Sequence, residues 1–269
     1  MTPSPEEKNE DVFISLLAAD TNRTVYTDLT RHFPVTSISG HKYVMVLCHY
    51  DSNGIILRTL KNRSNIEAMR VYHDIYEYIK ARNCKPKLKI MDNEASTAVK
   101  RYITNANVNY QLVEPNNHRV HAAECAIRTF KNNVVAGLSS VHPKFPMYLW
   151  YELIPQAFIT LNLLRTYRTC TKISVYAHLH GTYNFGTTPL SPLGVRVLLY
   201  NDSNHTVSYV VHGDEAYYLG PALEHYRCYK LLFPSTGGIK ICATAQFFQQ
   251  MSQHQCYFQL LKYQWQLMS

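Results

Sequence analysis

Residues 41–62 read HKYVMVLCHYDSNGIILRTLKN, two runs rich in β-branched and other apolar residues on either side of Asn53-Gly54. Asn-Gly between two such runs is a strong signal for a tight turn in a β-hairpin. The preceding segment RTVYTDLT (23–30) alternates in the manner of a half-buried strand and carries Asp28 near its end. Three strands in meander order are therefore predicted.

Helical and strand patterns alternate after this meander. SNIEAMRVYHDIYEYIKARN (64–83) repeats apolar residues at every third or fourth position, which predicts an amphipathic helix with Ser64 as its N-cap. PKLKIMD (86–92) predicts a fourth strand, EASTAVKRYITNAN (94–107) a second helix and VNYQLV (108–113) a fifth strand. This order predicts a mixed α/β sheet of five strands flanked by helices.

Two longer helices are predicted beyond the fifth strand. The first runs from about residue 121 to 140 and has one apolar stripe, formed by Ala123, Ile127, Phe130, Val134 and Leu138. The second covers MYLWYELIPQAFITLNLLRTYR (147–168), with a kink expected at Pro155. After TTPLSPLG (187–194), short strand-like runs predict a small antiparallel sheet or barrel.

The predicted organisation has four parts. They are a lead-in (1–22), an α/β domain (23–185), a small β-rich module (186–245) and a glutamine-rich tail (246–269). No run of about 18 apolar residues indicates a membrane span. The start of the chain does not resemble a signal peptide, so we do not expect secretion.

The composition favours a polyanionic partner. The chain has 269 residues, 27 Lys and Arg against 19 Asp and Glu, and a formal net charge of +8. Eleven of the cations lie in residues 58–101. The seven cysteines include no C-x-x-C pair, which argues against a disulfide framework. A basic surface of this kind suits nucleic acid, although a solvated basic face is an equally ordinary explanation.

Three carboxylates stand at positions where they can converge. Asp28 and Asp92 come at the ends of the first and fourth predicted strands, and Glu124 lies near the start of the long helix. Ligands of α/β sheets commonly bind outside the carboxyl ends of the strands. Three carboxylates brought together repel one another unless divalent cations bind them, and Mg²⁺ prefers such oxygen ligands.

The helix that carries Glu124 also places two cations on the same polar face. Arg128 and Lys131 follow Glu124 at four and seven residues. Taken alone, this spacing is typical of a surface salt-bridge pattern. Taken with the two strand-end aspartates, it places cations that could hold phosphate next to a possible metal site.

Several motifs together resemble the integrase of LTR retrotransposons, of the copia-like kind within the retroviral-integrase superfamily. They are YTDLTRHFPVTS (26–37), KIMDNEAS (89–96), HRVHAAECAIRTFKN (118–132), LWYELIPQAFITLNLLR (149–165) and YYLGPALEHYRCY (217–229). The resemblance covers roughly residues 20–235. It implies an RNase H-like core followed by a small module like an SH3 barrel.

The resemblance also implies a site and a reaction. Asp28, Asp92 and Glu124 match the Asp, Asp, Glu triad that binds two Mg²⁺ or Mn²⁺ ions during DNA 3′-end processing and strand transfer. Arg128 and Lys131 occupy positions that face element DNA in the family. Such enzymes act as multimers on element ends and target DNA, in the nucleus or in the cytoplasm during element replication.

Other residues around this motif set are candidates for DNA contact, and some depart from the family. His118 and Arg119 lie in the loop that enters the catalytic helix. Arg31 stands where the family often has a turn glycine, and it could meet phosphate. Cys125 replaces a basic residue that is usual there.

Two alternative functions therefore stay open. One is an inactive nucleic-acid-binding remnant of a decayed element, and the other is a stand-alone nuclease of the same fold.

Overall fold

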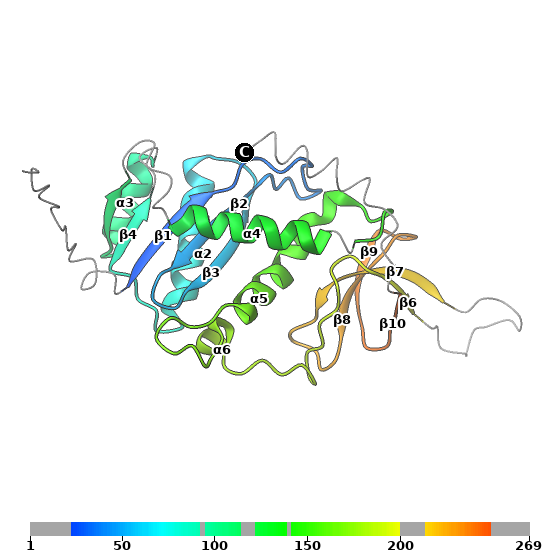
Figure 1. The fold of residues 1–269 in the computed structure, drawn as a ribbon. Coiled ribbons are helices and arrows are strands. Elements are labelled where there is room, and N and C mark those ends of the chain that lie inside the picture. Colours follow the sequence, from blue (N-terminus) through cyan, green and yellow to red (C-terminus); the bar gives the residue numbers. More distant parts are fainter. Residues whose placement is uncertain (1–22, 92–94, 114–121, 139–140, 200–212, 249–269) are drawn as a thin grey trace, which may run out of the picture.

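The computed structural model describes residues 23–91, 95–113, 122–138, 141–199 and 213–248. The first sheet has five strands in the order β3-β2-β1-β4-β5 (Figure 1). Their bounds are β1 Thr24–Leu29, β2 Tyr43–His49, β3 Gly54–Leu60, β4 Leu88–Met91 and β5 Asn109–Leu112. β1, β2 and β3 pair in antiparallel fashion, whereas β4 pairs parallel to both β1 and β5. The predicted mixed five-stranded sheet is confirmed, and it fits an RNase H-like core.

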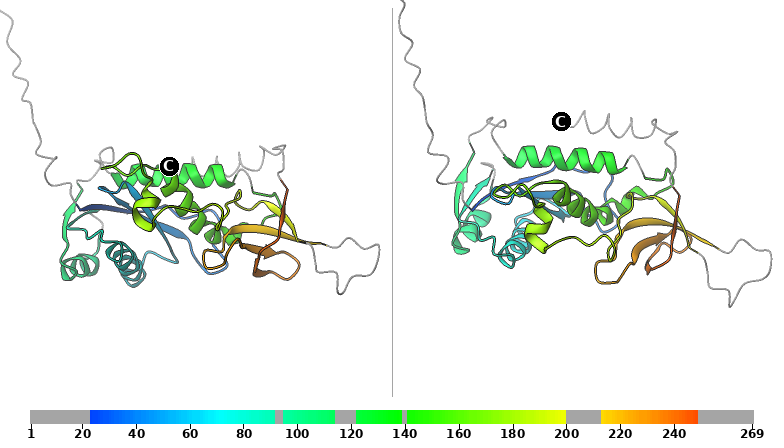
Figure 2. Two further views of the ribbon diagram at one scale, coloured as in Figure 1. Left: turned by 90° about the horizontal axis from the view of Figure 1, so that it is seen from below. Right: turned by 60° about the horizontal axis from the view of Figure 1, so that its bottom comes forward.

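Helices cover both faces of this sheet (Figure 2). One face carries α2 (Asn65–Lys80), α3 (Thr97–Asn105) and α6 (Val175–His180). The other carries α4 (Ala122–Leu138), the 3-10 helix η2 (Met147–Leu153) and α5 (Ile154–Leu164). Alternate residues of β2 enter opposite cores, as the pleat of a strand requires: Met45 and Leu47 pack with α2, and Val44 and Val46 with α4.

Serine caps set where three of the helices begin. Ser64 Oγ accepts the backbone N–H of Glu67, so α2 starts where the sequence predicts. Ser96 and Ser174 cap α3 and α6 in the same way. Five buried residues hold α2 against the sheet: Val71, Tyr72, Ile75, Tyr76 and Ile79. Ile66, which falls at the same apolar spacing near the start of the helix, is instead 79% exposed.

Pro155 does not kink one long helix, contrary to the sequence-based prediction. Residues 147–153 form the 3-10 helix η2, and α5 begins at Ile154 with Pro155 in its first turn. Proline fits there because the first amides of a helix have no intrahelical partner. The break therefore lies between two helices and lets each pack separately.

Four strands of the predicted C-terminal module, with β10 from the start of the predicted glutamine-rich tail, form a second, antiparallel sheet in the order β10-β6-β7-β8-β9. Their bounds are β6 Arg196–Leu199, β7 Asp214–Pro221, β8 Tyr229–Phe233, β9 Gly238–Cys242 and β10 Gln246–Phe247. Tyr217, Leu219 and Leu232 from one face of this sheet join the hydrophobic core formed by α4, η2 and α5. The likeness to an SH3 barrel and the domain boundaries stay predictions. One of the short strand-like runs that follow residue 194, TVSYVV (206–211), lies outside the described residues.

Within the part of the chain that the structure describes, no helix is both long enough and apolar enough to cross a membrane.

Candidate active site

Asp28 lies near the carboxyl end of β1, at the centre of the first sheet. Its Oδ1 atom accepts the backbone N–H of Leu29 at 2.6 Å, which fixes the orientation of the carboxylate. In the parallel pairing of β1 with β4, Thr27 lies beside Met91, the last residue of β4. Asp92 follows Met91 directly but lies outside the described residues. That Asp28 and Asp92 are neighbours is therefore a prediction, which the register between β1 and β4 supports.

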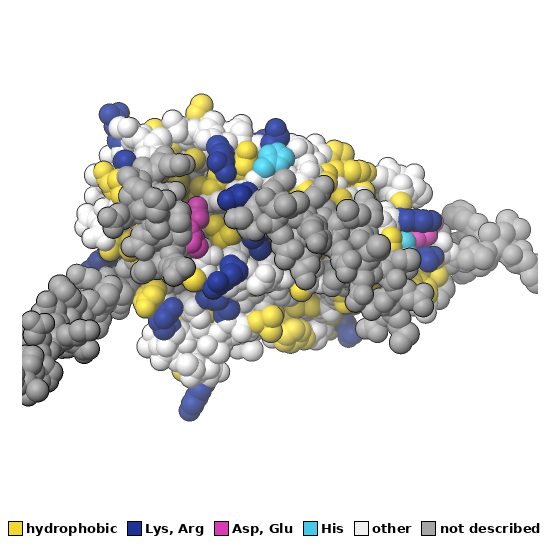
Figure 3. Space-filling model, turned by 45° about the horizontal axis from the view of Figure 1, so that its top comes forward, with side chains coloured by type: hydrophobic (Ala, Val, Ile, Leu, Met, Phe, Trp, Pro, Cys, Tyr) yellow, Lys and Arg dark blue, Asp and Glu magenta, His cyan; other side chains and the backbone are white. Residues whose placement is uncertain are grey.

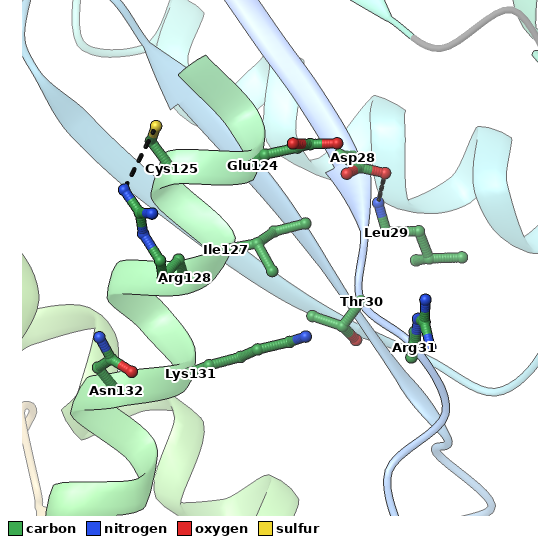
Figure 4. A pocket seen from close by; sticks show the side chains of 10 residues that line it. All are labelled: Asp28, Leu29, Thr30, Arg31, Glu124, Cys125, Ile127, Arg128, Lys131 and Asn132. Atoms are coloured by element: carbon green, nitrogen blue, oxygen red, sulfur yellow. Dashed lines mark hydrogen bonds between the residues drawn. The ribbon is translucent and has the colours of Figure 1, made fainter. Parts of the chain in front are cut away.

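Glu124 lies in the first turn of α4, on the edge of that helix that faces β1. The predicted apolar stripe sets this orientation, because all five of its residues, from Ala123 to Leu138, are buried in the core. Figure 4 shows the Glu124 and Asp28 side chains directed toward each other across the gap between α4 and β1. Two carboxylates far apart in the sequence thus face a shared space.

A cavity of about 570 Å³ contains this pair of acids. It is lined by Asp28, Leu29, Thr30, Arg31, Glu124, Cys125, Ile127, Arg128, Lys131 and Asn132. Five of the eight residues predicted as site residues, namely Asp28, Arg31, Glu124, Arg128 and Lys131, therefore line one cavity. Of the other three, Asp92, His118 and Arg119, the structure describes none.

Lys131 extends into the cavity from α4. Its side chain extends from α4 toward Thr30 and the end of β1 (Figure 4). Burial lowers the pKa of Lys131, the nearby Arg31 guanidinium lowers it further, and Asp28 acts in the opposite direction. Several Lys and Arg side chains also lie near the small acidic patch on this face of the molecule (Figure 3). An anion entering the cavity would meet several positive charges.

Arg128 points elsewhere. Its guanidinium turns along α4, where Nη2 lies 3.9 Å from the Sγ atom of Cys125 (Figure 4). Both side chains are exposed. Arg128 thus stands at the rim of the cavity, where a bound polyanion could still reach it by a change of rotamer.

A second cavity of about 350 Å³ borders Asp28 from the side of α2 and α3. Thr27, Arg63, Asn65, Tyr72 and Ser96 are among its lining residues. The Thr27 and Tyr72 hydroxyl groups lie 3.3 Å apart beneath it. The sequence did not indicate Arg63 and Asn65 as site residues: Arg63 was one of the cations of the basic region, and Asn65 is the first residue after the predicted N-cap.

The donor atoms of the main cavity suit a hard cation. Asp28 and Glu124 provide carboxylate oxygens, which Mg²⁺ and Mn²⁺ favour. Among the described residues that line the cavity, Cys125 is the one thiol, and none is a histidine. Among the described residues, no group of three or more His, Cys, Asp or Glu side chains is placed to hold a metal ion. The residues present thus fit part of a divalent-metal site, and Asp92 would have to contribute to it.

Comparisons with known proteins give distant structural likenesses. No protein-family model matches the sequence, and no curated protein matches it. Two structures of the HTLV-2 integrase catalytic core domain in complex with magnesium, a trimeric and a dimeric form, are 18% identical. They cover 59% and 60% of this chain and 97% of their own, with TM-scores of 0.43 and 0.44. A third structure is an intasome of simian T-cell lymphotropic virus in complex with a PP2A regulatory subunit. It is 16% identical, covers 87% of this chain and 80% of its own, and has a TM-score of 0.46. Likenesses at these values are too distant to assign the chain to a family.

Proposed function

We propose that this chain is an integrase-like polynucleotidyl transferase that processes DNA 3′ ends and joins them to target DNA. One observation carries the proposal: Asp28 and Glu124 face each other in a cavity that Arg31 and Lys131 also line. Carboxylates suit a divalent cation, and the adjacent cations suit the phosphates of the substrate. A cavity with both features favours phosphoryl transfer over chemistry that needs a protein nucleophile.

Each residue has a role in this proposal. Asp28, Asp92 and Glu124 would hold two Mg²⁺ or Mn²⁺ ions, which activate a water or a 3′ hydroxyl and stabilise the leaving oxygen of an in-line displacement. Lys131 and Arg31 would hold the phosphodiester beside the carboxylates. Arg128, His118 and Arg119 would contact the DNA further from the reacting phosphate.

The setting is part of the proposal too. We place the chain among copia-like LTR retrotransposon integrases, acting as a homo-oligomer on element ends and target DNA in the nucleus, or in the cytoplasm during element replication. The motifs from YTDLT to YYLGP support this setting.

The test is an assay of end processing and strand joining on element-end DNA with Mg²⁺ or Mn²⁺. The wild-type chain should give both products, and Glu124→Gln should give neither while it still binds DNA. Glu77→Gln, which removes an exposed carboxylate of α2 outside the cavity, is the matched control and should stay active.

The products also separate the two alternatives. Cleavage without joined strands would identify a nuclease. Salt-sensitive DNA binding without any metal-dependent cleavage would identify an inactive remnant. Full activity in Glu124→Gln would overturn the assignment of the site itself.

A further inference from the structure

Arg31 lies on an irregular segment, residues 30–42, that continues the hairpin of β1 and β2 beyond the sheet. The Thr30 and Phe33 amides donate to Val44 O at 2.9 Å and Lys42 O at 2.8 Å. Arg31 stands between these two connections and lines the main cavity. Its own side chain is exposed, so the position of its guanidinium depends on how firmly this segment is held.

Trp150, on η2, holds this segment in two ways. Its ring stacks on the Phe33 ring, with centroids 3.8 Å apart and planes within 6° of parallel. Its indole Nε1–H donates to the backbone carbonyl of Val35 at 2.8 Å. The Trp150 side chain is buried, with an exposed fraction of 3%, so it has little room to move. Phe33, the partner of the ring, is only two residues from Arg31.

The second sheet packs against η2, the helix that carries Trp150. Leu232 and Tyr217 belong to the same buried cluster as Trp150 and Phe33. Two residues beyond Trp150, Glu152 forms an ion pair with Lys230 of β8, with 2.5 Å between Nζ and Oε2. A continuous series of contacts thus runs from the second sheet through η2 to the segment that carries Arg31.

We propose that Trp150 is a positioning residue for the candidate active site: through Phe33 and Val35 it fixes the segment that places Arg31 in the cavity beside Asp28. The second sheet then contributes to the site without contacting its substrate, because it fixes η2. This inference rests on the proposed function, since Arg31 is a DNA ligand only if the cavity binds DNA.

The test is a double-mutant cycle between Trp150→Phe and Arg31→Ala, read as affinity for element-end DNA at several salt concentrations. Phenylalanine keeps a ring to stack on Phe33 and removes the N–H that Val35 accepts. Each single variant should bind about two- to tenfold more weakly, the range expected for one lost interaction. Each should also reduce the slope of log K against log salt by up to about 0.9, the value for one phosphate contact. In the Arg31→Ala background, Trp150→Phe should have no further effect on affinity.

Ile75→Val is the matched control for a general loss of packing. Ile75 is fully buried in the core on the other face of the first sheet, which does not include Trp150 or Phe33. This variant should destabilise the fold but leave the DNA affinity and the salt slope of the folded protein unchanged. Additive losses from Trp150→Phe and Arg31→Ala would overturn the positioning role.

Amide hydrogen exchange tests, without any DNA, whether Trp150 holds the segment of residues 30–42. Trp150→Phe should speed exchange in residues 30–42 and leave the strands of the first sheet protected. If the wild-type chain binds no DNA, the proposed function fails, and the exchange result still decides whether Trp150 holds the segment. Unchanged exchange in residues 30–42 would overturn the inference even if the chain joins DNA strands.

Discussion

The amine of Lys89 lies 3.2 Å from the centre of the Tyr72 ring, inside the core between the first sheet and α2. Lys89 is completely buried, and none of the described residues forms a hydrogen bond with its Nζ atom. In β4 it lies between Val25 of β1 and Tyr110 of β5. Burial lowers the pKa of Lys89 well below its usual range, because a charged amine would lose its hydration there.

Replacing Lys89 by methionine should stabilise the protein. The unfolded chain protonates Lys89 below its ordinary pKa of about 10.4, whereas the folded chain resists protonation until the pH falls to the lowered value. The wild-type protein therefore loses stability as the pH falls between those two values, by at most about 1.4 kcal/mol per pH unit. Lys89→Met removes this loss and should therefore unfold at a higher urea concentration than the wild type at pH 7.

Urea unfolding of the wild-type and Lys89→Met chains from pH 6 to pH 10 tests this prediction. Lys87→Met is the matched control, because Lys87 is exposed two residues earlier in the sequence. The control should unfold at wild-type urea concentrations throughout. Equal stability of Lys89→Met and wild type at pH 7 would show that Lys89 is solvated or paired in solution.

Asn162 should be among the residues most costly to replace. Its side chain is fully buried in α5 and pairs with the backbone of Ile55 in β3, an edge strand of the first sheet. Oδ1 accepts the Ile55 N–H at 3.0 Å, and Nδ2 donates to the Ile55 carbonyl at 2.7 Å. Asn162→Ala leaves both backbone groups buried without these partners and should cost about 2–5 kcal/mol of unfolding free energy.

Chemical denaturation measures that cost. Leu164→Ala is the control on the same helix, because Leu164 is 79% exposed and should contribute little. A loss below about 1 kcal/mol for Asn162→Ala would mean that water replaces the amide at the edge of β3.

The sequence predicts the first sheet well because its signals are local. The apolar runs around Asn53-Gly54 specify the hairpin, and the serine at position 64 specifies where α2 begins. The burial of Lys89 was not predictable: it was counted among the cations of a basic surface, and its neighbours are set by sheet register. Asn162 gave no signal either, since a polar residue in an apolar helix has meaning only once its partner strand is known.

The candidate site was predictable in part, for a related reason. The period of the apolar stripe on α4 fixes which side Glu124 faces, and a strand end fixes Asp28. Side-chain direction is a different matter. Arg128 has the spacing of a cavity residue, yet its guanidinium turns toward Cys125, three residues earlier on the same helix, because helical spacing does not fix the rotamer of a side chain.

Lys131→Ala should weaken DNA binding and its dependence on salt. Lys131 extends into the cavity, so its removal deletes a cation next to the expected phosphate. The expected result is a weaker affinity at low salt and a slope of log K against log salt that is smaller by up to about 0.9. Lys144→Ala, an exposed lysine that does not line the cavity, should change neither quantity. If the two variants behave alike, DNA binding is spread over the basic surface and is not centred on the cavity.

Divalent metal should stabilise the wild-type chain in the absence of DNA, and this effect should depend on Glu124. A ligand that binds only the folded state raises the unfolding free energy by about 2.7 kcal/mol at one hundred times its dissociation constant. Thermal unfolding with increasing Mn²⁺ or Mg²⁺ should therefore show a rising Tm for wild type and a much smaller rise for Glu124→Gln. Glu215→Gln removes a carboxylate that pairs with Arg196 in the second sheet and should keep the full metal response. An equal rise in Tm for wild type, Glu124→Gln and Glu215→Gln would mean that the metal binds away from Glu124, which would contradict the proposed site.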